Sequence, residues 1–379
     1  MQHIKEEAGM TRFFRQFIFV LFAVVLRWPI WMLIWLAGRS GLLKTLFLIY
    51  PTDKSECLDF CPDIKMLRDF LSGRPTPAGL IMNGWLPMGV YLVIPDQALE
   101  LMLKKNRYVV ERIVRRMQWI QKLAGAQTIG LAGQLGPIFE KRHGIPMVHP
   151  FYSSMDGNLF SIKTAIDHIL STAKKRPWQV SVAIVGGGEL GEELQGYLTS
   201  GGYETTMVDV RYARNGDVRL SDEQAADDQL CDKSIVINLL PRGKDFMGCR
   251  LHERIPGSAT VVDFSRPPIR PQDIRQKVVM GNRVQRQGIR FLMKLPGGWK
   301  GHELPACSMP SLVAALSGVM IASREQFLEI AEGLTFCTGL EERRTQLGWL
   351  RSNRWLGALD VQKTTVYDGR ISCDVLPFL

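Results

Sequence analysis

The segment VSVAIVGGGELGEELQGYL, residues 180–198, constrains the fold more than any other part of the chain. A hydrophobic strand runs directly into Gly186, Gly188 and Gly191, and an amphipathic helix follows. In a Rossmann fold the first glycine permits a tight turn, the second lets a pyrophosphate approach the backbone, and the third lets helix and strand pack closely. The segment therefore predicts a dinucleotide-binding unit. A glycine-rich turn without a cofactor is the alternative.

Strands and helices alternate through the region around this loop. The pattern predicts strands at 181–185, 205–210, 234–239 and 260–264, with a helix at 189–198. Such a succession is typical of a doubly wound parallel sheet.

Three residues near the end of the second predicted strand bear on the choice of cofactor. Asp209 follows Gly191 by 18 residues, where an acidic residue usually binds the ribose diol of NAD. Arg211 and Arg214 come next and are suited to a 2′-phosphate. These residues are compatible with both NADPH and NADH.

The apolar run from Phe17 to Ala37 contains one charge, Arg27, and one helix breaker, Pro29. Its length just suffices to span a bilayer, but a central Arg and Pro disfavour a straight spanning helix. We therefore expect either a retained anchor or a bent, monotopic insertion at the cytoplasmic face of a membrane. A buried helical hairpin is the third interpretation. The flanking cations suit anionic headgroups: Arg12, Arg15, Arg39 and Lys44.

Composition narrows the function classes. The net charge of +10 is spread over 379 residues without a long basic run, so nucleic-acid binding is not expected. An acidic partner or an anionic membrane surface would account for the positive charge equally well. The seven cysteines are dispersed without CxxC pairs, which predicts a reducing compartment and no metal site.

A candidate nucleophile lies in HELPACSMPSLVAALSG, residues 302–318. Cys307 comes just before a predicted helix whose start is marked by Ser308 and Pro310. The positive field of a helix N-terminus, with Lys300 and His302 nearby, favours the nucleophilic thiolate. A small buried hydrophobic residue is the alternative interpretation of Cys307.

Glycines also punctuate TIGLAGQLGPIF, residues 128–139. Gly130, Gly133 and Gly136 interrupt an apolar strand and open a turn, which allows a ligand to approach the backbone. A tight turn into a buried helix is the alternative. Gly157 and Asn158 predict a further turn before a helix at 159–174.

These motifs together resemble the long-chain acyl-carrier-protein reductases of cyanobacteria, which make fatty aldehydes from acyl thioesters. The resemblance runs from about Leu46 to about Gly333, and the turn at residues 157–158 belongs to it. It is carried by FLIYPTD, GVYLVIP, AGAQTIGLAGQLGPIFEK, VAIVGGGELG, VVDFSRP and LPACSMPSLVAALSG. The glycine loop is one residue shorter than the family's, and soluble family members lack the apolar N-terminal run.

The resemblance implies a reaction in two stages. Cys307 would take the acyl group from acyl carrier protein or acyl-CoA, and hydride from NADPH, or NADH, would release the aldehyde. His302 would donate a proton or add positive charge, with an ordinary loop histidine as the alternative. The segment Ile129–Gly136 would line an acyl channel, with Asn158 beside it.

Two other functions remain open on the residues alone. One is a different oxidoreductase, of the shikimate-dehydrogenase or glutamyl-tRNA-reductase sort, on the same scaffold. The other is a membrane-tethered dinucleotide sensor that is not an enzyme.

The expected architecture is α/β with a membrane-associated helical segment at the N-terminus. We expect a membrane anchor or hairpin at 1–49, an α/β acyl-binding domain at 50–165, and a Rossmann domain with the nucleophile loop at 166–312. A C-terminal helical segment at 313–379 is expected to pack back on the core.

Overall fold

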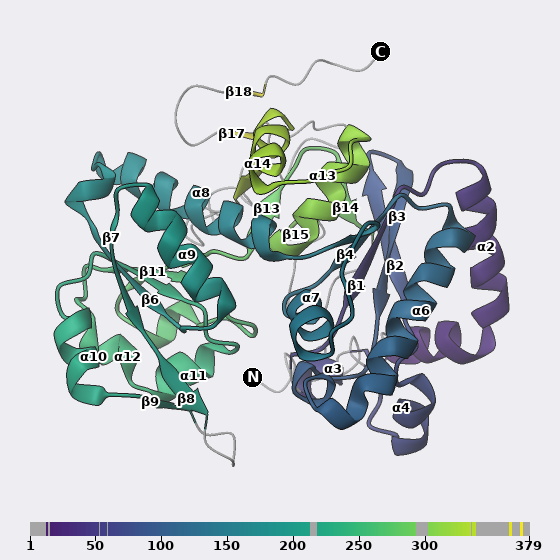
Figure 1. Ribbon diagram of the computed structural model, residues 1–379, viewed down its shortest axis with the longest axis horizontal. Coiled ribbons are helices and arrows are strands. Elements are labelled where there is room, and N and C mark those ends of the chain that lie inside the picture. Colours follow the sequence, from purple (N-terminus) through teal and green to yellow (C-terminus); the bar gives the residue numbers. More distant parts are fainter. Residues whose placement is uncertain are drawn as a thin grey trace, which may run out of the picture. The chain divides into compact units, whose positions relative to one another are not determined.

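The computed structural model describes residues 13, 16–52, 54–58, 60–212, 218–292, 302–334, 336–338, 364–365 and 372–373. Within them the chain forms two compact units, seen as ribbons in Figure 1. Unit 1 comprises the described residues up to Asn158 and those of Gly288–Phe336. Unit 2 comprises Leu159–Gln287 and the described residues from Cys337 onwards.

Unit 1 is built on a mixed six-stranded sheet in the order β14-β2-β3-β1-β4-β5. The strand β1 is parallel to β3 and β4, and β4 is parallel to β5, whereas β2 is antiparallel to both β3 and β14. All five residues of β1 are buried, as a central parallel strand requires. The strands are β1 Thr45–Ile49, β2 Thr76–Asn83, β3 Leu86–Val93, β4 Thr128–Leu131, β5 Phe151–Tyr152 and β14 Ile289–Phe291.

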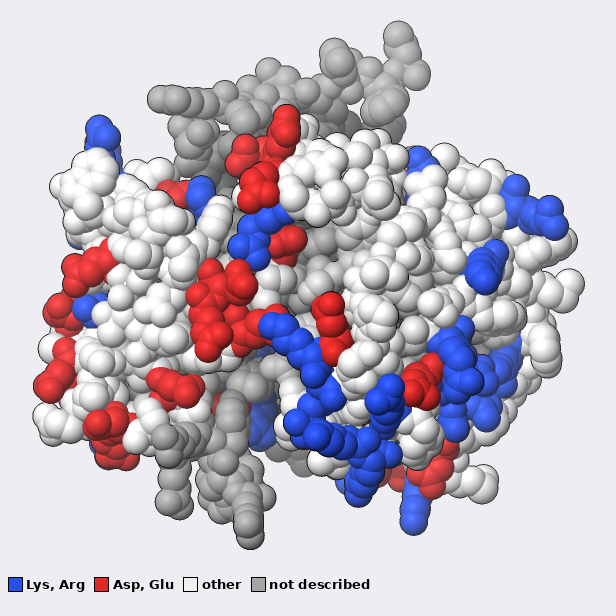
Figure 2. Space-filling model, in the orientation of Figure 1, with Lys and Arg blue, Asp and Glu red and all other residues white. Residues whose placement is uncertain are grey.

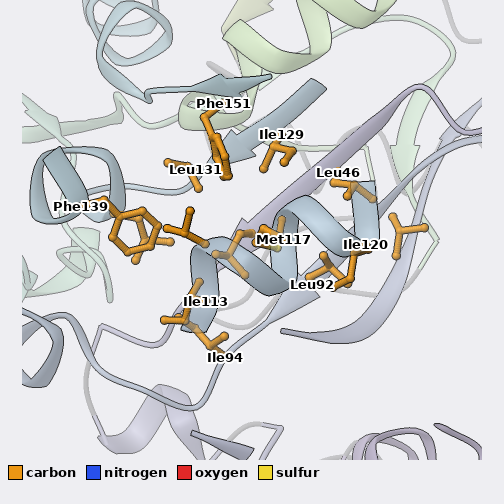
Figure 3. Close-up of a cluster of buried hydrophobic side chains, with 14 of the residues drawn as sticks. Leu46, Leu92, Ile94, Ile113, Met117, Ile120, Ile129, Leu131, Phe139 and Phe151 are labelled. Carbon is orange, nitrogen blue, oxygen red and sulfur yellow. The ribbon is translucent and has the colours of Figure 1, made fainter. Parts of the chain in front are cut away.

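One face of this sheet is covered by α6, Arg107–Ala124. Its buried residues recur at helical spacing, and Ile113, Met117 and Ile120 meet Leu46 and other apolar side chains of the sheet (Figure 3). The helix ends at Gly125, whose φ of +59° forms a left-handed cap. This apolar layer is the core of unit 1.

The opposite face of the sheet is covered by the segment that returns to unit 1 after Gly288. Gly130 and Phe47 face α13, where a Cβ on Gly130 would lie 2.3 Å from Ser311 Oγ. The buried Thr128 hydroxyl donates to the Ser311 carbonyl oxygen at 3.1 Å. The elements of this segment are β15 Leu304–Pro305, the 3₁₀ turn η6 Ala306–Ser308, α13 Met309–Ser317 and α14 Arg324–Gly333.

The apolar N-terminal run forms a bent helical arm on unit 1. A π-helical turn, η1 at Leu21–Val25, precedes α2 at Arg27–Arg39. Among the described residues, no single helix is both long and apolar enough to cross a membrane. The helices Gln16–Val25 and Arg27–Arg39 meet those criteria only as a pair, with a bend of 83° between them.

Short helices complete unit 1. They are α3 Lys54–Cys57, α4 Lys65–Leu71, α5 Ala98–Leu101, the 3₁₀ turn η2 Lys104–Asn106, α7 Leu135–Pro137 and the π-helical turn η3 Ile138–Arg142. The long helix α8, Met155–Ala173, begins in unit 1 and continues into unit 2.

Unit 2 contains a five-stranded sheet in the order β12-β11-β10-β6-β7, and every neighbouring pair in it is parallel. The strands are β6 Ser181–Val185, β7 Glu204–Val208, β10 Ile235–Asn238, β11 Thr260–Asp263 and β12 Lys277–Met280. Numbered by position in the unit, the order is 2-1-3-4-5, a doubly wound arrangement of the flavodoxin type. The predicted parallel sheet is therefore confirmed.

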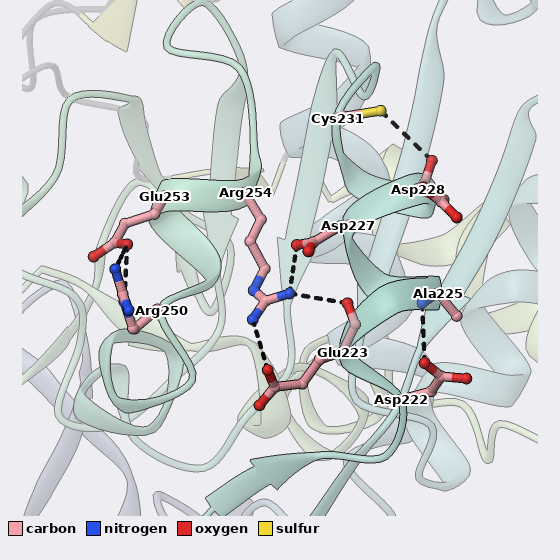
Figure 4. A network of polar contacts seen from close by, with 9 residues as sticks. All are labelled: Asp222, Glu223, Ala225, Asp227, Asp228, Cys231, Arg250, Glu253 and Arg254. Atoms are coloured by element: carbon pink, nitrogen blue, oxygen red, sulfur yellow. Dashed lines mark hydrogen bonds and ion pairs between the residues drawn. The ribbon is translucent and has the colours of Figure 1, made fainter.

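Helices connect these strands, chiefly α9 at Glu189–Ser200, α10 at Glu223–Leu230 and α12 at Leu251–Arg254. Arg254 joins α12 to α10, because its guanidinium donates to the Glu223 carbonyl oxygen at 2.9 Å and pairs with Asp227 (Figure 4). The remaining elements are η4 Pro177–Gln179, β8 Val210–Tyr212, β9 Val218–Leu220, α11 Gly243–Gly248, η5 Pro271–Asp273, β13 Arg283–Gln285, β16 Cys337–Thr338, β17 Thr364–Thr365 and β18 Ser372–Cys373.

The structure differs from the sequence predictions in three places. Gly157 and Asn158 do not form a turn but lie in the first turns of α8. The run at 45–49, included in the expected anchor, is the central strand of unit 1. Gly288–Phe336 belongs to unit 1, so the segment around Cys307 is not part of the unit that carries the glycine loop. Of the expected helical segment at 313–379, the structure describes the second half of α13, then α14 and the short strands β16, β17 and β18.

A buried carboxylate fixes the carboxyl edge of the sheet in unit 2. Asp263, at the end of β11, accepts hydrogen bonds from Asn238 Nδ2 at 2.8 Å, Ser265 Oγ at 2.7 Å and the Ile269 amide at 2.6 Å. Burial raises the pKa of the Asp263 carboxyl, and these hydrogen bonds oppose that rise. The group ties β10 and β11 to the loop that follows them.

We expect Asp263→Asn to lower the free energy of unfolding by about 1–3 kcal/mol, because an amide in either orientation sets a donor against a buried donor. The comparison is Asp273→Asn, which removes only an ion pair with the exposed Arg270 and should cost about 0–1 kcal/mol. Urea unfolding followed by circular dichroism measures both. Equal losses would contradict the role given to Asp263.

Candidate functional site

The glycine loop of unit 2 joins the carboxyl end of β6 to α9. Gly186 has a φ of +115°, a conformation that side chains rarely adopt. A Cβ on Gly191 would lie 2.1 Å from the Gly186 carbonyl oxygen, a distance that no side chain tolerates. Strand and helix therefore pack at a separation that only glycine allows, as the motif predicts.

Gly188 differs from its two neighbours in the motif. It is the N-cap residue of α9, and a Cβ there would meet no atom within 4 Å. The protein's own packing thus does not require glycine at this position. An incoming pyrophosphate would, because it approaches the backbone at the positive N-terminus of the helix. The loop therefore fits a dinucleotide.

Asp209 lies beside this loop, directly after β7. Its exposed carboxylate accepts hydrogen bonds through Oδ1 from the amides of Gly187, at 3.3 Å, and Val210, at 2.8 Å. This is where Rossmann domains bind the ribose hydroxyls. Arg211 lies on β8, but its side chain is outside the described part of the structure, as is the whole of Arg214. The prediction of a 2′-phosphate site at these arginines therefore stays a prediction.

The loop also lies where the chain reverses its direction of travel across the sheet. The Gly186 amide donates to the Val208 carbonyl oxygen of β7 at 2.9 Å. On the other side, a Cβ on Gly186 would lie 3.3 Å from Leu239 Cβ, just after β10. In open α/β sheets, ligands bind at the carboxyl ends of the strands at such a switch point.

Cys307 lies in unit 1, in the middle of the 3₁₀ turn that leads into α13. Its side chain is intermediate in exposure, whereas Ala306 and Ser308 on either side are buried. The Ser308 hydroxyl donates to the Pro305 carbonyl oxygen at 2.7 Å and holds the turn. The predicted position of this thiol at a helix N-terminus is confirmed. The alternative of a fully buried residue is not what the structure has.

The start of α8 packs against this turn. A Cβ on Gly157 would lie 2.2 Å from the Ala306 carbonyl oxygen, so only glycine fits. Next to it, Asn158 is buried, and its Oδ1 has no hydrogen-bond partner within the described residues. A buried polar atom of this kind is costly unless something pairs with it. The predicted role of Asn158 toward a substrate stays a prediction.

The three glycines predicted to contact an acyl chain each have protein atoms close to them. Besides the contact of Gly130 with Ser311, a Cβ on Gly133, at φ +49°, would lie 2.6 Å from the Tyr50 hydroxyl. A Cβ on Gly136 would lie 3.1 Å from Ser153 Oγ. These glycines permit close packing around β4 and α7, and their role toward a ligand stays a prediction.

His302 lies in the same unit as Cys307, in a turn ahead of β15, and its side chain is exposed. Lys300 lies outside the described residues. An exposed imidazole near the start of this segment is available to solvent and to a ligand, so its predicted role as a proton donor stays a prediction.

Sequence reasoning did not single out Asn238 or Asp263, which hold the edge of the sheet next to the glycine loop. The signal was present, since each ends a short apolar strand, IVIN and TVVD, with a polar residue. Ser311 was identified only as a marker of the helix start, and its contact with Thr128, 183 residues away in sequence, was not predicted.

Comparisons with known proteins found similarity to solved structures at low sequence identity. No family model matches the sequence, and no curated protein does. Among solved structures, the hetero-hexameric glutamate dehydrogenase of Thermus thermophilus is 13% identical, with a TM-score of 0.39, over 77% of this chain and 74% of that one. The Trypanosoma brucei N5,N10-methylenetetrahydrofolate dehydrogenase-cyclohydrolase, complexed with NADP cofactor and an inhibitor, is 12% identical, with a TM-score of 0.34, over 80% and 95%.

The NADPH-dependent glyoxylate/hydroxypyruvate reductase of Sinorhizobium meliloti is 15% identical, with a TM-score of 0.22, over 32% of this chain and 72% of that one. Similarities this distant assign no activity to this chain.

We expect Gly191→Ala to weaken NADPH binding at least tenfold and to lower the free energy of unfolding by about 1–3 kcal/mol, because the added methyl group displaces the loop. Gly196→Ala lies in the same helix with open space at its Cβ and should change stability by at most about 1 kcal/mol, in the stabilising direction. Fluorescence titration with NADPH and urea unfolding report the two effects. Unchanged binding in Gly191→Ala would show that the loop does not hold the dinucleotide.

Proposed function

We propose that this chain is a nicotinamide-dependent reductase that converts a long-chain acyl thioester into a fatty aldehyde through an acyl group carried on Cys307. The observation that carries the proposal is the position of Cys307, a partly exposed thiol at the N-terminus of α13 in a chain that also has a dinucleotide-type glycine loop. The sequence resemblance to acyl-carrier-protein reductases supports the choice of substrate.

The residues of unit 2 suit the cofactor. Gly186 and Gly191 shape the loop, Gly188 leaves room for the pyrophosphate, and Asp209 presents a carboxylate to the ribose. When bound, NADPH, or NADH, supplies the hydride that replaces Sγ on the acyl carbon and releases the aldehyde.

The residues of unit 1 suit the acyl transfer. The Cys307 thiolate attacks the thioester carbonyl, a C–Sγ bond forms, and the C–S bond to the carrier thiol or to coenzyme A breaks. The departing thiolate takes a proton, for which His302 is the candidate donor. The field at the start of α13 favours the anionic Sγ both before the attack and after the aldehyde leaves.

A polar partner for the acyl carbonyl is also within unit 1. The backbone amides at the start of a helix stabilise a developing oxyanion. Pro310 carries no amide hydrogen, and the Met309 amide donates to the Ala306 carbonyl oxygen, so the amides of Cys307 and Ser308 are the candidates for this task.

We expect Cys307→Ala to abolish the acyl adduct formed with palmitoyl-CoA or palmitoyl-carrier protein in the absence of nicotinamide, as seen by intact-protein mass spectrometry. Aldehyde formation should fall on the order of 10³-fold or more, because the nucleophile is lost. The matched control is Cys231→Ala, since Cys231 is an exposed thiol of unit 2 whose Sγ donates only weakly, to the Asp228 carbonyl oxygen at 3.6 Å.

The control variant should form the adduct like the wild type, and both variants should still bind NADPH. An adduct that persists in Cys307→Ala, or NADPH binding with no adduct in the wild type, would refute the covalent mechanism.

A further inference from the structure

A cluster of arginines lines a hollow of unit 1, beside the helical arm. Arg27 is the first residue of α2, Arg74 follows α4, and Arg116 lies on α6. They line this hollow together with Trp31, Phe70 and Trp119. Arg112 lies one helical turn from Arg116. Segments far apart in the sequence thus bring four guanidinium groups together.

Nothing acidic balances this cluster within the described part of the chain. None of the four arginines forms an ion pair there; Arg112 donates to the Ser72 carbonyl oxygen at 3.3 Å, and Arg74 lies over the Phe70 ring at 4.2 Å. Arg74 Nε is buried and has no hydrogen-bond partner among the residues that the structure describes. Burial, with repulsion from Arg27 and Arg112, lowers the pKa of Arg74, and burial and the other three arginines do the same to Arg116. An anion in the hollow would relieve both the repulsion and the unpaired donor.

The helical arm presents a continuous apolar surface next to this hollow. One stripe of α2 is buried against α6, where Trp31 meets Trp119 edge-on at 5.6 Å. The opposite stripe, at helical spacing, is exposed: Trp28 at 74%, Met32 at 62% and Leu36 at 53%. The preceding turn exposes Val25 at 67%. An exposed apolar stripe of this extent on a folded unit marks an interaction surface.

The arm is fixed to the unit and not merely tethered to it. A Cβ on Gly38 would lie 2.3 Å from the Ala124 carbonyl oxygen, so the end of α2 crosses the end of α6 in backbone contact. At the other end, Gln16 Nε2 donates to the Leu58 carbonyl oxygen at 2.6 Å, and Phe19 packs on Phe60 at 5.2 Å. The exposed stripe is therefore held in a set orientation relative to the arginines.

The two features adjoin, because Arg27 lines the hollow and Trp28 begins the exposed stripe. Lys and Arg side chains also gather over the region of α6 on the face shown in Figure 2. Phosphate oxygens match guanidinium groups, and tryptophan and aliphatic side chains favour the boundary between headgroups and acyl chains. Of the surfaces a protein meets, an anionic bilayer supplies phosphates and apolar chains side by side.

We propose that this face of unit 1 docks on an anionic phospholipid bilayer, with a headgroup phosphate bound by Arg27, Arg74 and Arg116 and the exposed stripe of α2 inserted at the level of the upper acyl chains. The arm lies in the plane of the interface, consistent with its 83° bend. The inference is independent of the proposed reductase activity, since it uses neither Cys307 nor the glycine loop.

The test is co-sedimentation of the full chain with phosphatidylcholine vesicles that contain or lack phosphatidylglycerol. We expect the wild type to bind the anionic vesicles and Arg74→Gln/Arg116→Gln to bind them at least tenfold more weakly. Each cation near a membrane surface strengthens binding about fivefold. The matched control, Arg270→Gln/Arg275→Gln, removes the same charge from two exposed positions in unit 2 and should change binding less than twofold. Equal loss in both variants would overturn the pocket as the binding site.

A second pair of variants tests the apolar stripe, should the double arginine variant fail to fold. Trp28→Ser should weaken vesicle binding at least fivefold, whereas Trp178→Ser, at a tryptophan of unit 2 with 68% exposure, should not. Binding of Trp28→Ser equal to that of the wild type would overturn the insertion.

Assays with inorganic phosphate and with an acidic carrier protein distinguish the other ligands that the hollow could bind. Thermal stabilisation by phosphate that depends on Arg74 and Arg116, with no vesicle binding, would assign the hollow to a soluble phosphate and overturn the bilayer. Carrier-protein binding that is lost in Arg74→Gln/Arg116→Gln, again with no vesicle binding, would assign it to a protein partner and overturn it equally.

Discussion

Close packing that only glycine permits is the constraint on which the functional features of this molecule depend. At five described glycines a Cβ would lie within 2.1–2.3 Å of another residue's atoms, and four of these contacts position the features discussed above. These four contacts set the packing of α9 on β6, of α8 on the turn that holds Cys307, of α13 on β4, and of the helical arm on α6. The contacts are Gly191 with Gly186, Gly157 with Ala306, Gly130 with Ser311 and Gly38 with Ala124. Dense packing of this kind leaves little room for adjustment, so these contacts hold each feature in place.

Local pattern was sufficient to predict the dinucleotide-type unit. The strand β6, the loop and α9 are contiguous in sequence, and their periodicity and glycine spacing are set by the nearest neighbours along the chain. The thiol at the start of α13 was predictable for the same reason, since Ser308 and Pro310 mark a helix start. The apolar run at 45–49 shows where prediction from local pattern fails. A short apolar segment has the same pattern whether it belongs to an anchor or forms a buried parallel strand.

Features that depend on distant contacts could not be read from the sequence. Gly157 was predicted to form a turn. In the structure, glycine is needed there because the Ala306 carbonyl oxygen, from a segment about 150 residues away, lies where a Cβ would be. The membership of Gly288–Phe336 in unit 1 follows from the pairing of β14 with β2, which no local signal announces. The arginine hollow is of the same kind, since Arg27, Arg74 and Arg116 come from separate elements and only the fold brings them together.

Leu159–Gln287 of unit 2 lies between the two stretches of unit 1 in sequence, which affects the order in which the sheets can form. On the ribosome, all strands of the parallel sheet of unit 2 have been synthesised once the chain reaches Met280. The first sheet, begun at Thr45, still lacks its edge strand β14 and the helix that covers Phe47 and Gly130. Domains generally fold as units during synthesis, so the parallel sheet of unit 2 is ready to form before the sheet of unit 1 is complete. Until α13 emerges, one apolar face of the first sheet stays uncovered in the nascent chain, and that interval is when a chaperone has a surface to hold.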